Sequence, residues 1–261
     1  MALPVVAGAG AGDTDFSGTA TVPYPASIAA DDLLILHCGI NNNSDTVTTP
    51  SGWTAFPGNP YSGGSDTRCY LFWKKASGSE SGDLSVTWTA ANRMNSRIFR
   101  VTGQHLTTPF GTPSSSTGAS GTLADEGVTT TAADSLALNF ITFGRENITA
   151  LAAMTGMSGG TWVEDFAEYA AGGTPPDYIT IALQRADMAS AGTINGGTAT
   201  ATGWSSRTWV VVGVELFAAE SVDLDQVDPD ADVTTTGWTT TPLWSKVNDG
   251  SDASYITATA S

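Results

Sequence analysis

Apolar and polar side chains alternate one by one along most of this chain, and clusters of Gly, Pro, Asn and Ser interrupt the alternation at short intervals. In 83–90, for example, Leu84, Val86 and Trp88 alternate with Ser and Thr. Residues two apart share one face of a β-strand, whereas one face of a helix repeats every 3.6 residues. Helical spacing is nearly absent from the chain. The pattern therefore predicts an all-β fold, an antiparallel β-sandwich of a jelly-roll-like kind.

Three further strands are predicted in the first part of the chain, at 31–40, 67–76 and 96–103. In 31–40 the alternation gives one face with Leu34, Leu36, Cys38 and Ile40 and another with Leu33, Ile35 and His37. The two cysteines of the chain, Cys38 and Cys69, each lie in one of these apolar strands. They are either two buried free thiols or the partners of a single disulfide, and their apolar surroundings favour free thiols.

A turn of small residues delivers a tryptophan into a strand twice, in "PSGWTAF" (50–56) and "SGGTWVEDF" (158–166). In each copy a later strand ends in a basic residue and Ala, and a Gly follows seven positions after the basic residue. These residues are Lys75 and Gly82 in the first copy and Arg185 and Gly192 in the second. The order of features predicts two similar four-strand units, about 20–103 and 127–217, each with its turn tryptophan as a core anchor. Chance similarity between Thr- and Gly-rich strands is the alternative.

Composition divides the chain into four parts. Residues 1–19 are rich in Gly and Ala and predict an N-terminal arm. The sandwich domain is expected over 20–219, with a Pro-, Ser- and Gly-rich connector at 107–122 between its two units. Residues 220–232 are acidic and contain a Pro, which is typical of a linker. The segment 233–261 starts new strands but is too short to close a sheet, so it is either an incomplete second β-domain or a tail that packs on a partner.

The charge of the chain limits its partners. It carries 26 acidic and 10 basic residues, a formal net charge of −16, and no Lys or Arg precedes Arg68. Nucleic acids and anionic membranes are bound through Lys and Arg, so the charge argues against both as partners. No segment approaches the ~18 apolar residues of a membrane span. The first residues lack the positively charged region of a standard signal peptide, so we expect a protein made in a reducing cytoplasm.

The chain contains no H-E-x-x-H, no P-loop, no G-x-G-x-x-G after a strand and no paired Cys or His spacing of a zinc site. His37 fits a half-buried sheet residue and His105 a solvated residue better than a general base. An EF-hand loop that starts at Asp228 in the acidic run 220–232 would have Val233 in place of its Gly and Thr239 in place of its Glu, which favours a solvated linker over a calcium site. A carboxylate cluster at Glu164, Asp165 and Glu168 has the residue types of glycoside hydrolysis, although a solvated loop is the simpler interpretation. We expect no catalytic residue, cofactor or metal.

Three segments carry a resemblance to a known family: "VPYPASIAADDLLILHCGINNNSDTVTTPSGWTAF" (22–56), "LFWKKASGSESGDLSVTW" (71–88) and "SRIFRVTG" (96–103). They resemble a β-sandwich domain of virion-surface and tail-fibre proteins of tailed bacteriophages and their prophages. The resemblance spans about 1–219, and 237–260 resembles the opening strands of a second sandwich domain at the tips of such fibres. Asp31-Asp32 stands where the family more often has Gly-Asp. The family has no catalytic residues to carry over.

The resemblance implies a non-enzymatic structural protein of the virion surface: a head decoration, a head-fibre subunit or a tail-fibre subunit, assembled in the host cytoplasm. Leu3, Pro4, Val5 and Val6 are expected to attach the arm to other capsid or tail proteins, while the C-terminal part projects outward. A homo-oligomer is expected, and a trimer is favoured because fibres are commonly three-fold.

Two other classes of function are open. A carbohydrate-binding module that adheres to a host glycan would use exposed aromatic rings beside polar loops, and its candidates are Tyr61, Trp204 and Trp238. Trp53 also lies near such a turn, but a core position is favoured for it. A depolymerase would act through the carboxylate cluster, which is its sole support.

Overall fold

The structure is a computed structural model, and it describes residues 3–15, 17–64, 66–89, 92–119, 122–124, 127–144, 150–151, 158–168, 179–194, 198–202, 208–219, 246–248 and 253–255. All regular elements among these residues are β-strands, and their pairs are antiparallel. The chain divides into two compact units, Met1–Glu220 and Ser221–Ser261. The prediction of an all-β, antiparallel fold is confirmed.

The first sheet has seven strands in the order β1-β9-β4-β7-β5, with β2 also paired to β9 and β6 to β7. Its strands are β1 (Val5–Ala9), β2 (Asp13–Asp15), β4 (Ala30–Ile40), β5 (Thr54–Ala55), β6 (Tyr61–Gly63), β7 (Thr67–Ser77) and β9 (Met94–Thr102). The strands predicted at 31–40, 67–76 and 96–103 correspond to β4, β7 and β9. Strand β4 is central, with β7 on one side and β9 on the other.

The second sheet has five strands in the order β10-β19-β13-β16-β15. Its strands are β10 (Ser114–Gly118), β13 (Ser135–Gly144), β15 (Val163–Glu168), β16 (Ile179–Met188) and β19 (Trp209–Leu216). Strand β13 is central, as β4 is in the first sheet. Strand β19 lies on one side of β13, and β16 and then β15 lie on the other, in the same order as β9, β7 and β5 lie about β4. One pairing order therefore occurs twice along the chain.

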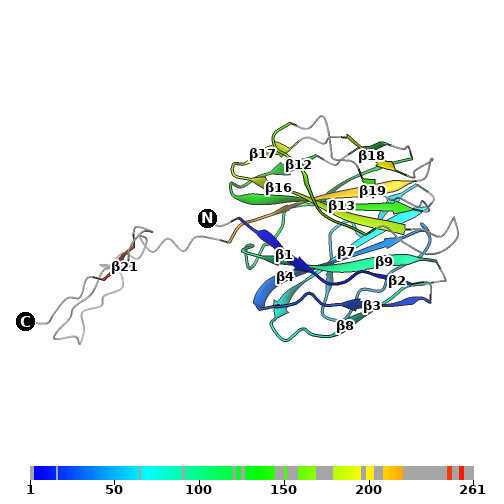
Figure 1. Ribbon diagram of the computed structural model, residues 1–261, viewed down its shortest axis with the longest axis horizontal. Coiled ribbons are helices and arrows are strands. Elements are labelled where there is room, and N and C mark those ends of the chain that lie inside the picture. Colours follow the sequence, from blue (N-terminus) through cyan, green and yellow to red (C-terminus); the bar gives the residue numbers. More distant parts are fainter. Residues whose placement is uncertain are drawn as a thin grey trace, which may run out of the picture. The chain divides into compact units, whose positions relative to one another are not determined.

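Each sheet is accompanied by a two-stranded ribbon: β3 (Thr19–Pro23) with β8 (Asp83–Thr87), and β12 (Val128–Thr130) with β17 (Gly192–Ile194). Figure 1 shows the resulting stack of layers, with one ribbon at each outer side and the two sheets between them. A small three-stranded sheet is formed by β11 (Thr122–Ala124), β18 (Thr198–Thr202) and β14 (Ala150–Leu151).

Both faces of the central strands are buried. Alternate residues of β4 point into different cores: Ile35 into a central core between the two sheets, and Leu36 into an outer core under the β3–β8 ribbon. In β13, Leu138 points into the central core and Ile141 into a second outer core under the β12–β17 ribbon. A strand buried on both faces is apolar at nearly every position. This explains why β4 and β13 carry Leu and Ile on both of their faces.

The two turn tryptophans are core anchors, as the sequence predicts. Trp53 precedes β5 and lies in the first outer core, while Trp162 precedes β15 and lies in the second. Each ring is 6% exposed. Gly52 and Gly159, with φ of 79° and 86°, give each turn the left-handed backbone that a larger residue rarely adopts.

A pair of aspartates aligns the two halves of the unit. Asp31 and Asp134 both have positive φ, 70° and 58°, and each lies two residues before the leucine that begins the central strand pairing. These leucines are Leu33 and Leu136, so the two positions correspond.

This alignment corrects a detail of the predicted repeat. Lys75 lies opposite Leu33, and Asp187 lies opposite Leu136. Lys75 therefore corresponds to Asp187 and not to Arg185. The predicted match between the two basic residues is displaced by two positions. The parity of the strand is unaffected by a shift of two, so the faces of the strand are still assigned correctly.

The sequence predicts a separate arm over 1–19, and the structure corrects this. Val5–Ala9 forms the edge strand β1 on β9, and Val6 packs against the central core. Strand β2 continues along the same edge of β9. Gly and Ala make up 8 of the residues 1–19, so the segment lacks the apolar alternation by which a strand is recognised.

The predicted connector over 107–122 likewise forms part of a sheet. It contains β10, and Phe110 forms a bridge with Leu216 and packs against the central core. Strand β10 lies beside β19, and β1 and β2 lie beside β9, so the two segments occupy corresponding edges. Each half therefore begins earlier than the predicted residues 20 and 127, and includes more paired strands than the four expected. A duplication of one unit stays a prediction.

The second compact unit, Ser221–Ser261, contains a described hairpin of β20 (Lys246–Asn248) and β21 (Ala253–Tyr255). The first unit ends at Glu220, one residue after the end that the sequence indicates. The predicted linker, 220–232, lies outside the described residues.

Candidate functional site

The chain enters and leaves the first unit at one end of the stack. The backbone N–H of Ala219 donates to the carbonyl of Gly103 over 2.8 Å. A side-chain carbon on Gly103 would lie 3.2 Å from the carbonyl oxygen of Leu3. Leu3, Gly103 and Ala219 therefore meet, and we call this end of the unit the connection end. Strands β9 and β19 both finish there.

A pocket of about 350 Å³ lies beside the connection end, in the second half of the unit. Its walls come from the segment before β10, from β12 and from the end of β19. The polar lining includes Thr112, Ser114, Thr129, Thr131 and Glu215, and Val128 and Phe217 supply apolar surface. This volume is at the lower end of the ~300–1,000 Å³ range of small-molecule sites.

Glu215 is the charged group of this pocket, and it is 5% exposed. Its Oε1 accepts hydrogen bonds from the backbone N–H of Thr131 (2.6 Å) and of Ala132 (3.2 Å) and from Ser135 Oγ (3.0 Å). Its Oε2 accepts one bond, from Thr131 Oγ1 at 3.1 Å. The carboxylate thus fixes the loop between β12 and β13. No Lys or Arg in the described part of the chain forms an ion pair with it.

In the first half of the unit, the position that corresponds to Glu215 carries the opposite charge. Arg100 lies opposite Leu34 and Glu215 opposite Ala137, so these two residues correspond. In the first half the carboxylate is on Asp32, whose Oδ2 accepts from the Ala29 N–H (2.8 Å) and from Arg100 Nε (2.6 Å). A neutral residue, Ser135, stands at the position that corresponds to Asp32. Only the first half therefore contains an ion pair at this place.

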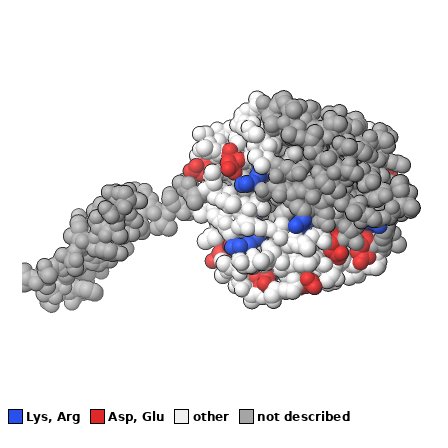
Figure 2. All heavy atoms as spheres, viewed as in Figure 1, with Lys and Arg blue, Asp and Glu red and all other residues white. Residues whose placement is uncertain are grey.

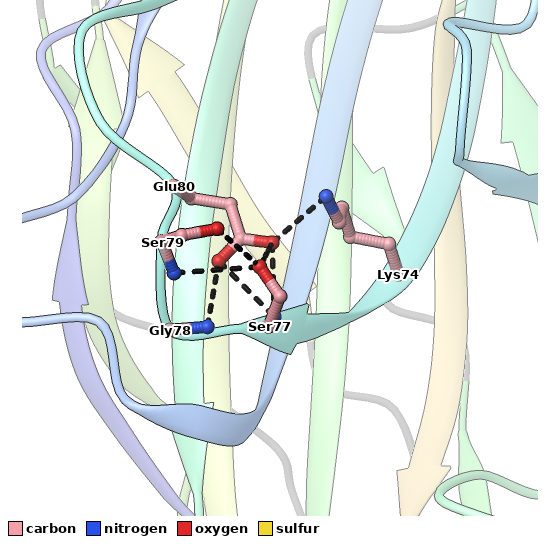
Figure 3. Close-up of polar contacts among 5 residues, drawn as sticks. All are labelled: Lys74, Ser77, Gly78, Ser79 and Glu80. Atoms are coloured by element: carbon pink, nitrogen blue, oxygen red, sulfur yellow. Dashed lines mark hydrogen bonds and ion pairs between the residues drawn. The ribbon is translucent and has the colours of Figure 1, made fainter.

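A second ordered carboxylate, Glu80, braces the hairpin between β7 and β8 (Figure 3). Its Oε1 is 2.8 Å from Lys74 Nζ, and the carboxylate also accepts from the N–H groups of Ser77 and Gly78. Burial alone would raise the pKa of Glu80, but the hydrogen bonds from Lys74 and Ser77 outweigh it and lower the pKa to about 2. All of its partners are structural, so this group stabilises a turn.

His37 is fully buried, whereas the sequence predicts a half-buried residue. Its Nε2 lies 2.8 Å from Thr142 Oγ1, and its ring packs edge-on against Phe140. Burial lowers the pKa of His37 to about 3, so the ring is neutral and enclosed between the two sheets. His105 Nδ1 accepts hydrogen bonds from the backbone N–H groups of Thr107 and Thr108.

Cys38 and Cys69 are free thiols on opposite faces of the first sheet. Cys38 lies in the outer core and Cys69 in the central core. Burial raises the pKa of both thiols, to about 12 for Cys69. The interpretation as buried free thiols is confirmed.

The aromatic residues chosen for glycan contact are not brought together in the described structure. Tyr61 is 7% exposed, belongs to the central core and donates its hydroxyl to the Pro57 carbonyl over 2.6 Å. Burial raises the pKa of its phenol. The prediction that Tyr61 is an exposed aromatic platform for a sugar is therefore wrong. Trp204 and Trp238 lie outside the described residues, so they stay candidates from the sequence alone.

The carboxylate cluster of the sequence lies on β15, an edge strand and not a loop. Glu164 pairs with Gln184 and Glu168 with Ile181, and an irregularity in the register falls at Asp165. Within the described ranges, no group of three or more His, Cys, Asp or Glu is arranged to hold a metal ion. Among the same residues, no helix has the length and apolar character that a membrane crossing requires.

The pocket and Glu215 are features that the sequence does not reveal. Glu215 lies in "WVVVGVELF" (209–217), which has the pattern of a buried strand, and the pocket depends on strands distant in sequence. Comparisons of the chain with protein families, with curated proteins and with solved structures found no match.

Proposed function

We propose that this chain is a non-enzymatic structural protein on the surface of a tailed-phage virion, as a head decoration, head-fibre or tail-fibre subunit. The resemblance of the sequence over 22–103 supports the setting. The observation that carries the structural role is the stack of two sheets and two ribbons around three apolar cores. Because both faces of each central sheet are buried, the unit is a stiff block that meets its surroundings through loops and strand edges.

The charge of the surface fits this role. Among the described residues on the face drawn in Figure 2, acidic and basic side chains are scattered over a mainly uncharged surface. The net charge of −16 keeps copies of the chain from associating without specific contacts. The partners we propose are other virion proteins and further copies of the same chain, with a closed trimer as the assembly.

The connection end gives this proposal its orientation. Leu3 and Ala219 lie at one end of the unit, so we propose that this end faces the rest of the virion and that the opposite end is presented to the medium. The expected projection of the C-terminal part concerns residues after Ala219, most of which lie outside the described residues, and it stays a proposal. The edge of β1, where Val5 is 44% exposed, is part of the attachment surface in this view.

Mass spectrometry of purified particles tests the setting, and the protein is expected among the virion components. Its absence from particles would overturn the proposal. The orientation is tested by electron microscopy of particles with a gold label either at the N-terminus or in the loop 42–44. The loop label is expected farther from the particle axis or shell, and the reverse order would contradict the orientation. The mass of the purified protein in solution tests the trimer.

A further inference from the structure

One position beside the central strands is closely packed in the first half of the unit and borders a pocket in the second half. In the first half, Gly10 donates its N–H to the carbonyl of Ile98 and lies directly against the chain at Pro23. A side-chain carbon on Gly10 would lie 2.0 Å from the Pro23 carbonyl oxygen, so no space is left there. In the second half Ser114 pairs with Gly213 at the corresponding position of β19, and Ser114 lines the pocket.

A difference in loop length accompanies the pocket. Tyr24 in the first half bonds to Gly82, and Thr130 in the second half pairs with Gly192. The loop between β3 and β4 runs over 24–29 and the loop between β12 and β13 over 131–134, so the second loop is two residues shorter. Tyr24 and Ile28 of the longer loop pack against the outer core. The shorter loop contains Thr131 and two alanines in place of such large apolar side chains, and Thr131 lines the pocket.

Glu215 gives this space a specific chemistry. A buried carboxylate is stable when hydrogen bonds and an opposite charge compensate the loss of water. Oε1 has three donors, but Oε2 has a single long one, and the corresponding ion pair of the first half is missing. Gly111 approaches this oxygen closely, since a side-chain carbon on it would lie 3.2 Å from Oε2. The pocket therefore offers an acceptor with unused capacity and no cation of its own among the described residues.

We propose that the pocket binds a primary ammonium group carried on a short aliphatic chain. An ammonium has three donors and suits a carboxylate oxygen surrounded by hydroxyl oxygens, which Thr112, Ser114 and Thr129 supply. The methylene chain of the ligand packs against Val128 and Phe217. The net negative charge of the protein raises the local concentration of cations. Two sources carry this group: a lysine side chain of a neighbouring protein and a free polyamine.

The test is a titration of the full chain with n-butylammonium and with n-butanol, its neutral counterpart, followed by amide shifts in NMR spectra. We expect saturable shifts around Gly111 and Gly213 with the amine and at least about tenfold weaker binding of the alcohol, the factor that corresponds to ~1.4 kcal/mol. Equal binding of the two probes, or no saturable shift with the amine, would overturn the proposal. This comparison uses the unmodified protein and so does not depend on any variant folding.

Two variants separate the charge of the pocket from its shape. Glu215→Gln keeps the side-chain volume and an acceptor for the loop but removes the charge, so amine binding is expected to fall at least about tenfold. Gly111→Ala keeps the charge and places a methyl group over Oε2, with the same expected loss. Asp83→Asn is the matched control, because it removes one exposed acidic charge elsewhere and should bind as the unmodified chain does. Unchanged binding in Glu215→Gln would overturn the proposal.

A second pair of probes distinguishes the sources of the amine. Nα-acetyl-lysine amide represents a lysine side chain in a protein, and spermidine represents a free polyamine. Tighter binding of the lysine derivative assigns the pocket to a neighbouring protein, and tighter binding of spermidine assigns it to a soluble amine. If neither competes with n-butylammonium, the proposal is wrong. The inference does not require the virion setting, so it can fail or succeed independently of the proposed function.

Discussion

At the scale of single residues, His37 couples the stability of the fold to pH. Its imidazole lies in the central core, where Thr142 Oγ1 is its hydrogen-bond partner and Phe140 covers its ring. Burial lowers the pKa of His37 from 6.5 to about 3. The unfolded chain therefore binds a proton on this residue below about pH 6.5, while the folded chain binds it only near pH 3.

We predict that stability falls as the pH falls through this window, by up to about 1.4 kcal/mol per pH unit. Above pH 6.5 the residue is neutral in both states and has no such effect. A His37→Gln variant keeps a hydrogen-bonding group beside Thr142 but does not titrate. Urea unfolding at several pH values between 7 and 5 should show a smaller slope for the variant, and an identical slope in both proteins would contradict the prediction.

Glu80 acts in a lower pH range. Its pKa, lowered to about 2 by Lys74 and Ser77 against the opposing effect of burial, implies a stabilisation that is fully present above about pH 4.5. This stabilisation is lost as the pH falls toward 2, because the unfolded chain takes up the proton first. The Glu80 side chain is 4% exposed, but its turn lies at the surface, so solvent screens the ion pair in part and the stabilisation is smaller than the full pKa shift would give.

We predict that Glu80→Gln destabilises the protein by on the order of 2 kcal/mol at pH 7 and by much less at pH 2.5. The measurement is the free energy of unfolding of both proteins at the two pH values. Asp83→Asn, at an exposed position of β8 three residues after Glu80, should behave as the unmodified protein. A difference that persists unchanged at pH 2.5 would show that the carboxylate charge is not the cause.

At the scale of elements, the edge strand β1 decides what the N-terminal segment does. It pairs with β9 from Val5 to Ala9, and Val6 and Ala9 pack against the central core. Removing residues 2–12 would free the edge of β9 and uncover part of that core. We predict a loss of at least about 2 kcal/mol in the free energy of unfolding, which denaturant titration measures.

The matched control removes residues 221–261, which belong to the other compact unit. This truncation should leave the stability of the first unit unchanged. If the N-terminal deletion is as stable as the full chain, the strand is dispensable, and the predicted attachment arm at Leu3 to Val6 regains its support.

The elements differ in how far the sequence reveals them. Strands β4 and β7 and the turn tryptophans are predictable because apolar alternation and Gly turns act locally. Strands β1 and β10 are not, because their Gly, Ala and Ser residues carry no apolar pattern and gain their order from the sheet beside them. In the sequence, Glu215 is a single charged residue within the pattern of a buried strand. Its role depends on Thr131 and Ser135, about eighty residues earlier in the chain, and no local pattern records such a contact.

At the scale of the whole molecule, the central core joins the two halves into one cooperative structure. Residues of both sheets form a single cluster, and the sheets approach closely at Gly39, where a side-chain carbon would lie 2.7 Å from Thr142 Cγ2 and 2.8 Å from Ile181 Cγ2. We predict one calorimetric transition for residues 1–220. A Gly39→Val variant should lower the midpoint strongly, because overpacking a core of this kind costs about 1–3 kcal/mol or more.

Gly192→Val, where a side-chain carbon would meet nothing within 4 Å, is the control and should have a much smaller effect. Two separate transitions in the unmodified protein would contradict the prediction, because they would mean that each half unfolds without the other.

The meeting of Leu3 and Ala219 at Gly103 has a consequence for the genetics of such a module. A domain whose first and last residues adjoin needs only a short opening in a host loop, so it can be inserted into another protein without stretching either chain. The same closeness allows the ends to be joined and new ends to be cut elsewhere. The unit is thus suited to recombination as a cassette, carried from one host protein to another as a single exchangeable piece.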